Sequence, residues 1–167
     1  MAPMQFEDIA VGAPVGPLTK GRISTAHIMR WSASVENWHR IHYDQAFATG
    51  HDGLPGVLIN GSWKQHVLVQ LMKDALGPAG WLWKIKFRYR KMDVAGDSIT
   101  ATGEVVEKQV AGGLGFVTCR VRLVTQDGGL STDGWAIGVL PLRDGAAVPY
   151  PFVPSAAHAG IVLPAEA

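Results

Sequence analysis

Cysteine is nearly absent from this sequence, and long apolar runs are absent altogether. The single cysteine, Cys119, excludes an intramolecular disulfide framework and a cysteine-rich metal site. It stands in a segment typical of a strand, where a small buried side chain is expected. No apolar run approaches the roughly 20 residues that a helix needs to cross a bilayer. The N-terminus also lacks a basic stretch followed by an apolar one. We therefore expect a cytoplasmic protein that does not enter a membrane.

Charge is sparse as well. Only 17% of the residues are charged, the net charge is +1, and the lysines and arginines are scattered. This composition does not favour nucleic acid or a membrane surface as a partner. Hydrophobic residues, in contrast, make up 47% of the 167 residues, which is ample for one packed core and suits a single domain.

Two helices are expected in the first half of the chain. Residues 1–22 are rich in glycine and proline, which predicts an irregular arm with at most one short edge strand. Ser24 or Thr25 can cap a helix over residues 26–34. A longer helix is expected over residues 61–76, because apolar residues recur there as a wide stripe. The stripe consists of Trp63, Val67, Leu68, Leu71, Met72, Ala75 and Leu76.

The second half of the chain has the pattern of an antiparallel sheet. In the first strand, Trp83, Ile85, Phe87 and Tyr89 alternate with basic residues and are expected to share one face. Three further strands are predicted over residues 98–108, 114–126 and 130–140, with tight glycine turns between them. Helices followed by strands indicate an α+β fold, in which one sheet wraps around the long central helix.

The end of the chain is expected to differ from the rest. Residues 1–142 are predicted to form the domain. Residues 143–167 are rich in proline and alanine and are predicted to be an extended tail without an element of its own.

Reactive side chains are concentrated in residues 37–44, Asn-Trp-His-Arg-Ile-His-Tyr-Asp. These eight residues hold two imidazoles, an amide, a guanidinium, a phenol and a carboxylate. Asp44 can cap a short turn over residues 45–48. Residues 58–63 follow about twenty positions later and lead into the long helix. We expect the two segments to face each other, the first supplying side chains and the second a backbone donor.

These segments resemble the MaoC-like hydratases and dehydratases, which are single hot dog domains acting on acyl thioesters. The family signature, roughly D-x-N-P-x-H, corresponds to residues 36–42, Glu-Asn-Trp-His-Arg-Ile-His. The family's step into its central helix corresponds to Ile59-Asn60-Gly61. Residues 87–97 resemble the family's strand and Gly-Asp turn, and residues 6–12 its opening. The resemblance covers roughly residues 5–140.

The motif departs from the family pattern at two points. The usual acidic residue is Asn37 here, and His39-Arg40 replaces Asn-Pro. The string N-x-H-R-I-H-Y-D resembles the branch of 3-hydroxyacyl-thioester dehydratases and mesaconyl-CoA hydratases. Since Asn37 cannot act as a base, the two-residue acid/base mechanism of the family loses one member.

The resemblance implies an enzyme, a carbon–oxygen lyase that interconverts 2-enoyl and 3-hydroxyacyl thioesters of CoA or a carrier protein. It implies catalytic roles for His42, Asn37 and Gly61. His42 would move the protons, since its ordinary pKa of about 6.5 lies near neutral pH. The Gly61 amide, at a helix start, would donate to the thioester oxygen. Asn37 could hold the water through its amide.

Substrate contacts are expected from His39, Arg40 and Ser62. For Arg40 a second interpretation is open, in which it ties down its own loop through Glu36 or Asp44. The basic residues Lys84, Lys86, Arg88 and Arg90 could meet phosphates or an acidic carrier protein, or could be a solvated sheet face. No cofactor is expected. No metal is expected either, because His39 and His42 lack a third ligand.

Two alternative functions and a dimer complete the expectations. Asn37 in place of an acid favours a non-catalytic hot dog subunit of a heteromeric dehydratase, whereas His42 and Gly61 argue against it. An acyl-CoA thioesterase would need a carboxylate, and Glu36 is the only candidate. The expected partner is a second hot dog chain, identical or different, joined edge to edge.

Overall fold

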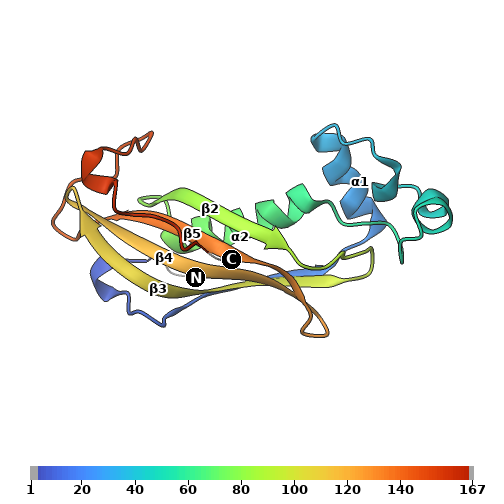
Figure 1. The fold of residues 1–167 in the computed structure, drawn as a ribbon, viewed down its shortest axis with the longest axis horizontal. Coiled ribbons are helices and arrows are strands. Elements are labelled where there is room, and N and C mark those ends of the chain that lie inside the picture. Colours follow the sequence, from blue (N-terminus) through green and yellow to red (C-terminus); the bar gives the residue numbers. More distant parts are fainter. Residues whose placement is uncertain (1–3, 166–167) are drawn as a thin grey trace.

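A long helix, α2 (Gly61–Leu76), lies along one face of a five-stranded antiparallel sheet in the computed structural model, which describes residues 4–165 (Figure 1). The strands follow in the order β1-β3-β4-β5-β2. Their bounds are β1 (Pro14–Arg22), β2 (Trp81–Tyr89), β3 (Ser98–Ala111), β4 (Leu114–Thr125) and β5 (Leu130–Pro141). The predicted α+β class and the sheet packed on a central helix are confirmed.

The core forms between α2 and the inner face of the sheet. The apolar stripe predicted for this helix is buried from Val67 to Leu76, and it packs against residues of β3, β4 and β5 such as Val105, Val121 and Ala136. Gly77 ends the helix with a φ of 69°, a left-handed conformation that glycine adopts without strain. The predicted bounds of this helix are confirmed.

The residues between β1 and α2 extend beyond the sheet. They contain α1 (Thr25–Ser34) and the short helices η2 (Arg40–His42) and η3 (Phe47–His51). Figure 1 shows them gathered at the end of the molecule where α2 begins. The Ser24 hydroxyl accepts a hydrogen bond from the His27 amide and caps α1, as predicted. No helix within residues 4–165 is long and apolar enough to cross a membrane.

The N-terminal strand is longer than predicted. After η1 (Phe6–Asp8), β1 runs for nine residues in a segment that we expected to be mostly irregular. It is an edge strand and pairs only with β3, so Pro14 and Pro17 break no hydrogen bond with a second neighbour. A register shift between Val15 and Leu18 accommodates Gly16, whose φ is 96°.

The prediction that Trp83 shares a face with Ile85 and Phe87 is wrong. A register shift between Leu82 and Lys84 reverses the alternation at this point of β2. Ile85 and Phe87 pack toward α2, whereas Trp83 lies on the outer face of the sheet.

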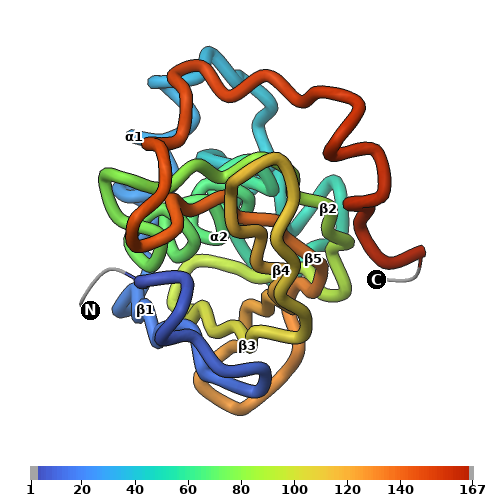
Figure 2. The backbone as a smooth tube through the Cα atoms, turned by 90° about the vertical axis from the view of Figure 1, so that its left-hand side faces the viewer, coloured from blue at the N-terminus to red at the C-terminus, as the bar shows by residue number. Residues whose placement is uncertain are grey.

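The tail also differs from its prediction, because it packs on its own sheet and contains the short helix η4 (Ala156–His158). Phe152 and Ile161 are buried against the outer face of the sheet. Lys84 Nζ donates to the Ile161 carbonyl at 2.8 Å and Lys86 Nζ to the Ala165 carbonyl at 3.0 Å. Figure 2 shows the tail, in red, running along the outside of the molecule. Part of the basic face of β2 therefore binds the tail.

Candidate active site

His42 is the best-placed acid/base group of the polar segment. It lies at the end of η2, is 7% exposed, and its Nδ1 is 2.8 Å from the Leu58 carbonyl oxygen. A carbonyl oxygen only accepts hydrogen bonds, so Nδ1 carries the hydrogen and donates. Nε2 is then the nitrogen that can accept a proton.

Burial lowers the pKa of His42 below its ordinary value. The hydrogen bond to Leu58 acts in the opposite direction, and the neighbouring His39 adds to the lowering. The net direction is downward, so the imidazole is neutral at pH 7. A neutral ring with a fixed tautomer is suited to act as a general base.

The N-terminus of α2 presents two unpaired amides. Asn60 occupies the N-cap position, but its side chain makes no capping hydrogen bond. Its Nδ2 and Oδ1 are instead 3.0 and 3.3 Å from the Ser32 hydroxyl of α1. Within residues 4–165, the amides of Gly61 and Ser62 have no hydrogen-bond acceptor. Amides at a helix start favour a negatively charged ligand.

Gly61 and Ser62 each contact another element. A Cβ on Gly61 would lie 2.9 Å from Tyr89 Cζ and 3.0 Å from its hydroxyl oxygen. The glycine therefore lets the Tyr89 ring of β2 lie against the helix start. The Ser62 hydroxyl accepts a hydrogen bond of 2.8 Å from Trp31 Nε1, which ties α1 to α2.

Asn37 and His39 stay close to the turn that carries His42. Asn37 Oδ1 accepts a hydrogen bond from the His39 amide at 3.2 Å, so its Nδ2 stays available as a donor. The His39 side chain is exposed, and its ring centroid is 6.3 Å from that of His42. The structure thus places the His39 ring near His42, and the substrate contacts of Asn37 and His39 stay predictions.

Arg40 ties down its own loop, as one of the two interpretations predicted. Its guanidinium is 2.6 Å from an oxygen of Asp44 and lies over the Phe47 ring. The second carboxylate oxygen of Asp44 accepts a hydrogen bond from the Phe47 amide at 2.9 Å. The predicted cap at Asp44 is confirmed, although the helical segment continues to His51.

Sequence reasoning missed a buried ion pair beneath the helix start. Lys64 Nζ is 2.7 Å from Asp93 Oδ2 and donates to the Lys91 carbonyl at 2.8 Å. The Ser131 hydroxyl donates to the same Asp93 oxygen at 2.5 Å. The signal was present, since Lys64 precedes Leu68 by four residues and therefore falls on the buried stripe. This pair joins α2 to the segment after β2.

Residues 16–96 match the family model of hydroxyacyl-thioester dehydratase type 2, Htd2. The matched segment is just under half of the chain. It contains both parts of the site, the turn with His42 and the helix start at Gly61. No protein of curated function is similar to the chain in sequence.

Solved structures similar to this chain show the hot dog fold. The (R)-hydratase from A. caviae is 24% identical, with a TM-score of 0.72, over 81% of this chain and 99% of its own. R-hydratase PhaJ1 from Pseudomonas aeruginosa is 18% identical, with a TM-score of 0.74, over 92% and 95%. A chain of the ChsH1–ChsH2 complex from Mycobacterium tuberculosis is 20% identical, with a TM-score of 0.67, over 78% and 98%. The predicted hot dog fold is confirmed.

Proposed function

We propose that this protein adds water to 2-enoyl thioesters to form (R)-3-hydroxyacyl thioesters, and catalyses the reverse dehydration. The observation that carries the proposal is the 2.8 Å hydrogen bond between His42 Nδ1 and the Leu58 carbonyl. This hydrogen bond holds the ring against a carbonyl that lies three residues before Gly61, where α2 begins with free amides. The proposed proton acceptor is thus bonded to the segment that leads into the proposed oxyanion donor.

The reaction needs one base, one proton donor and one oxyanion site. His42 Nε2 takes a proton from water as the water oxygen attacks the β-carbon of the enoyl group. The electron pair of the double bond moves toward the thioester oxygen, and the Gly61 amide stabilises the resulting enolate. The His42 imidazolium then returns the proton to the α-carbon. Asn37 orients the water through its free Nδ2.

The direct test is to mix the purified protein with crotonyl-CoA and to measure the loss of enoyl-thioester absorbance. Longer and branched 2-enoyl-CoA substrates follow, with chiral analysis of the 3-hydroxyacyl product. Turnover to the (R) product supports the proposal. If the folded protein turned over no enoyl thioester, the result would favour the alternative of a non-catalytic hot dog subunit. The presence of Asn37 at the acidic position already favours that alternative.

The pH dependence follows from the lowered pKa of His42. The neutral ring is the base for hydration, so kcat/KM is expected to fall as pH drops through the His42 pKa, below 6.5. The lowered pKa also means that the folded state binds this proton more weakly than the unfolded state. Its contribution to stability is present above pH 6.5 and is lost as pH falls below that value. A pH–rate profile whose acidic limb lies above pH 6.5 would contradict this assignment.

A second hot dog chain is the proposed partner. Both edge strands of the sheet, β1 and β2, have one side without a neighbouring strand among residues 4–165, so edge-to-edge pairing is open to them. The ChsH1–ChsH2 complex among the similar structures contains two different chains. Light scattering is expected to give the mass of a dimer at micromolar concentration, and a monomer would contradict the homodimer. A cytoplasmic location stays a prediction.

A further inference from the structure

The Tyr89 ring of β2 covers the first turn of α2. The three atoms nearest to a Cβ on Gly61 would all belong to the Tyr89 phenol, at 2.9, 3.0 and 3.1 Å. Lys64 follows Gly61 by three residues and therefore lies on the same face of the helix. Its Nζ is 5.1 Å from the centroid of the same ring. From the other side, β2 holds Tyr89 through its pairing with Thr132 of β5.

The Tyr89 hydroxyl is available to bind a ligand. Within residues 4–165 it has no hydrogen-bond partner, and the side chain makes its contacts through the ring, with Phe87 as well as with α2. A partly buried phenol usually has such a partner. Burial raises the pKa of Tyr89 above its ordinary value, so the hydroxyl keeps its hydrogen at neutral pH and can donate it. The residue is 49% exposed, so a ligand can reach it.

The hydroxyl and the Gly61 amide are close enough to bind one acceptor. The hydroxyl oxygen would lie 3.0 Å from a Cβ on Gly61. Because Cβ and the amide nitrogen are both bonded to the same Cα, the hydroxyl oxygen is at most about 6 Å from that nitrogen. Two donors that bind the same oxygen at about 2.9 Å each are likewise at most about 6 Å apart. An oxygen bound by the Gly61 amide is therefore within reach of the phenol.

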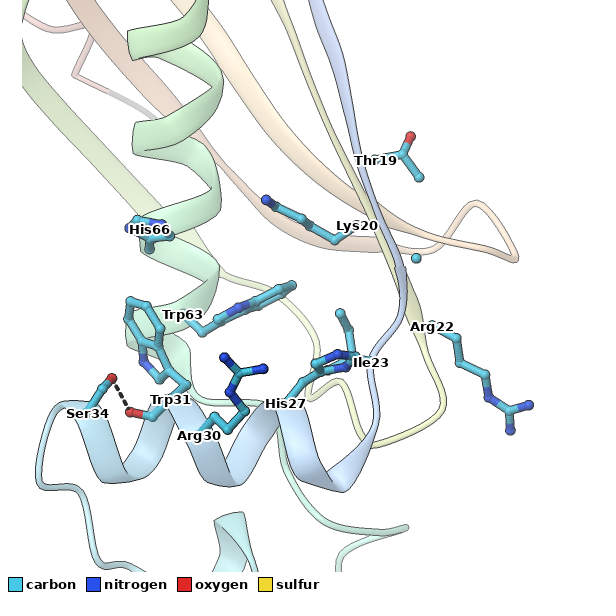
Figure 3. Close-up of a pocket in the computed structure, with 11 residues that line it drawn as sticks. Thr19, Lys20, Arg22, Ile23, His27, Arg30, Trp31, Ser34, Trp63 and His66 are labelled. Carbon is cyan, nitrogen blue, oxygen red and sulfur yellow. Dashed lines mark hydrogen bonds between the residues drawn. The ribbon is translucent and has the colours of Figure 1, made fainter.

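A cavity beside the same helix is separate from this pair of donors. It has a volume of about 620 Å³, lies between β1, α1 and α2, and is lined by Arg30, Trp31 and His66 among others (Figure 3). Trp31 packs against His66 there, with the ring centroids 5.1 Å apart. Neither Gly61 nor Tyr89 lines the cavity. The phenol therefore meets the helix start outside it.

Resting on the function proposed above, we infer that Tyr89 is a second oxyanion donor, whose hydroxyl binds the thioester oxygen together with the Gly61 amide. Its hydrogen bond strengthens as negative charge develops on that oxygen in the enolate. The phenol donates this bond and keeps its hydrogen, so the proton transfers stay with His42. Because the interaction is strongest in the transition state, Tyr89 is expected to affect kcat far more than KM.

The kinetic test compares Tyr89→Phe with Tyr150→Phe. Each variant removes one phenolic hydroxyl, but Tyr150 lies in the tail, is 88% exposed and packs on Trp81. Tyr89→Phe keeps the ring against Gly61 and is expected to lower kcat for crotonyl-CoA about 10²-fold, the lower end of the usual loss for one oxyanion donor. KM and the melting temperature should stay close to the wild type. Unchanged kcat in Tyr89→Phe, or an equal loss in Tyr150→Phe, would overturn the inference.

A binding test decides the inference even if no enoyl thioester is turned over. Acetoacetyl-CoA ionises to an enolate that absorbs in the ultraviolet and carries part of its charge on the thioester oxygen. We expect bound acetoacetyl-CoA to ionise about one to two pH units higher in Tyr89→Phe than in the wild type, the equivalent of one hydrogen bond to a charged group. The Tyr150→Phe variant should match the wild type.

Two results of the binding test would refute the role of Tyr89. One is ionisation of bound acetoacetyl-CoA at the same pH in Tyr89→Phe and the wild type, and the other is failure of the wild type to bind the enolate. If the ionisation difference were present but the wild type turned over no enoyl thioester, the result would count against the proposed hydratase and support Tyr89 as a donor.

Discussion

Replacing His42 by alanine is expected to lower kcat/KM for crotonyl-CoA hydration by about 10²–10⁴-fold, the usual contribution of a general acid–base group. The effect is large because the same ring takes the proton from water and returns it to the α-carbon. In the proposed mechanism no carboxylate shares this work, since Asn37 stands at the acidic position of the family motif. Initial rates with the purified variant measure the loss.

Two further variants separate catalysis from folding. His42→Asn keeps an N–H donor near the position of Nδ1, and therefore a contact with the Leu58 carbonyl, but removes Nε2. It is expected to be as inactive as His42→Ala and closer to the wild type in thermal stability. His51→Ala is the matched control, since His51 follows in the same segment and its side chain is 71% exposed. Equal loss of activity in His42→Ala and His51→Ala would disprove the role of His42.

Replacing Lys64 by methionine is expected to lower the free energy of unfolding by about 3–5 kcal/mol, the cost of leaving one charge of a buried pair alone. Lys64 and Asp93 are 3% and 1% exposed, so water does not reach the carboxylate that remains. The second oxygen of Asp93 already lacks a hydrogen-bond partner in the described residues. Urea unfolding followed by fluorescence measures the change.

Charge, and not the length of the side chain, should decide this result. Adding Asp93→Asn to Lys64→Met is expected to recover part of the loss, because the lone carboxylate becomes a neutral amide. Lys91→Met is the control, since Lys91 pairs with Asp127 at 3.7 Å on the exposed surface. Surface pairs contribute about 0–1 kcal/mol. If Lys64→Met cost no more than Lys91→Met, the pair would not hold the helix start.

The helix α2 could be predicted from the sequence because its signals are local. The apolar stripe and Gly77-Pro78 set its face and its end without knowledge of the rest of the chain. The same holds for the caps at Ser24 and Asp44, whose side chains bond to amides three residues away. His42 and Gly61 could be selected because each belongs to a short stretch of consecutive residues that resembles a family motif.

What could not be predicted depends on partners far apart in the chain. The side of Trp83 is set by a shift in its pairing with β5, which begins almost fifty residues later. The burial of Phe152 needs the outer face of the sheet, and alternation within the tail does not report it. The cavity at Arg30 likewise needs β1, α1 and α2 together.

At Asn60, a change that stabilises the protein against heat is expected to lower its activity. Asparagine is among the best residues for closing a helix start, yet here Ser32 holds its amide and the two following N–H groups stay open. Directed evolution for heat resistance would select any substitution whose side chain accepts a hydrogen bond from those N–H groups. The resulting proteins would melt later and process their substrate more slowly. Stabilised variants of this chain should therefore be screened for activity before changes at positions 32 and 60 are kept.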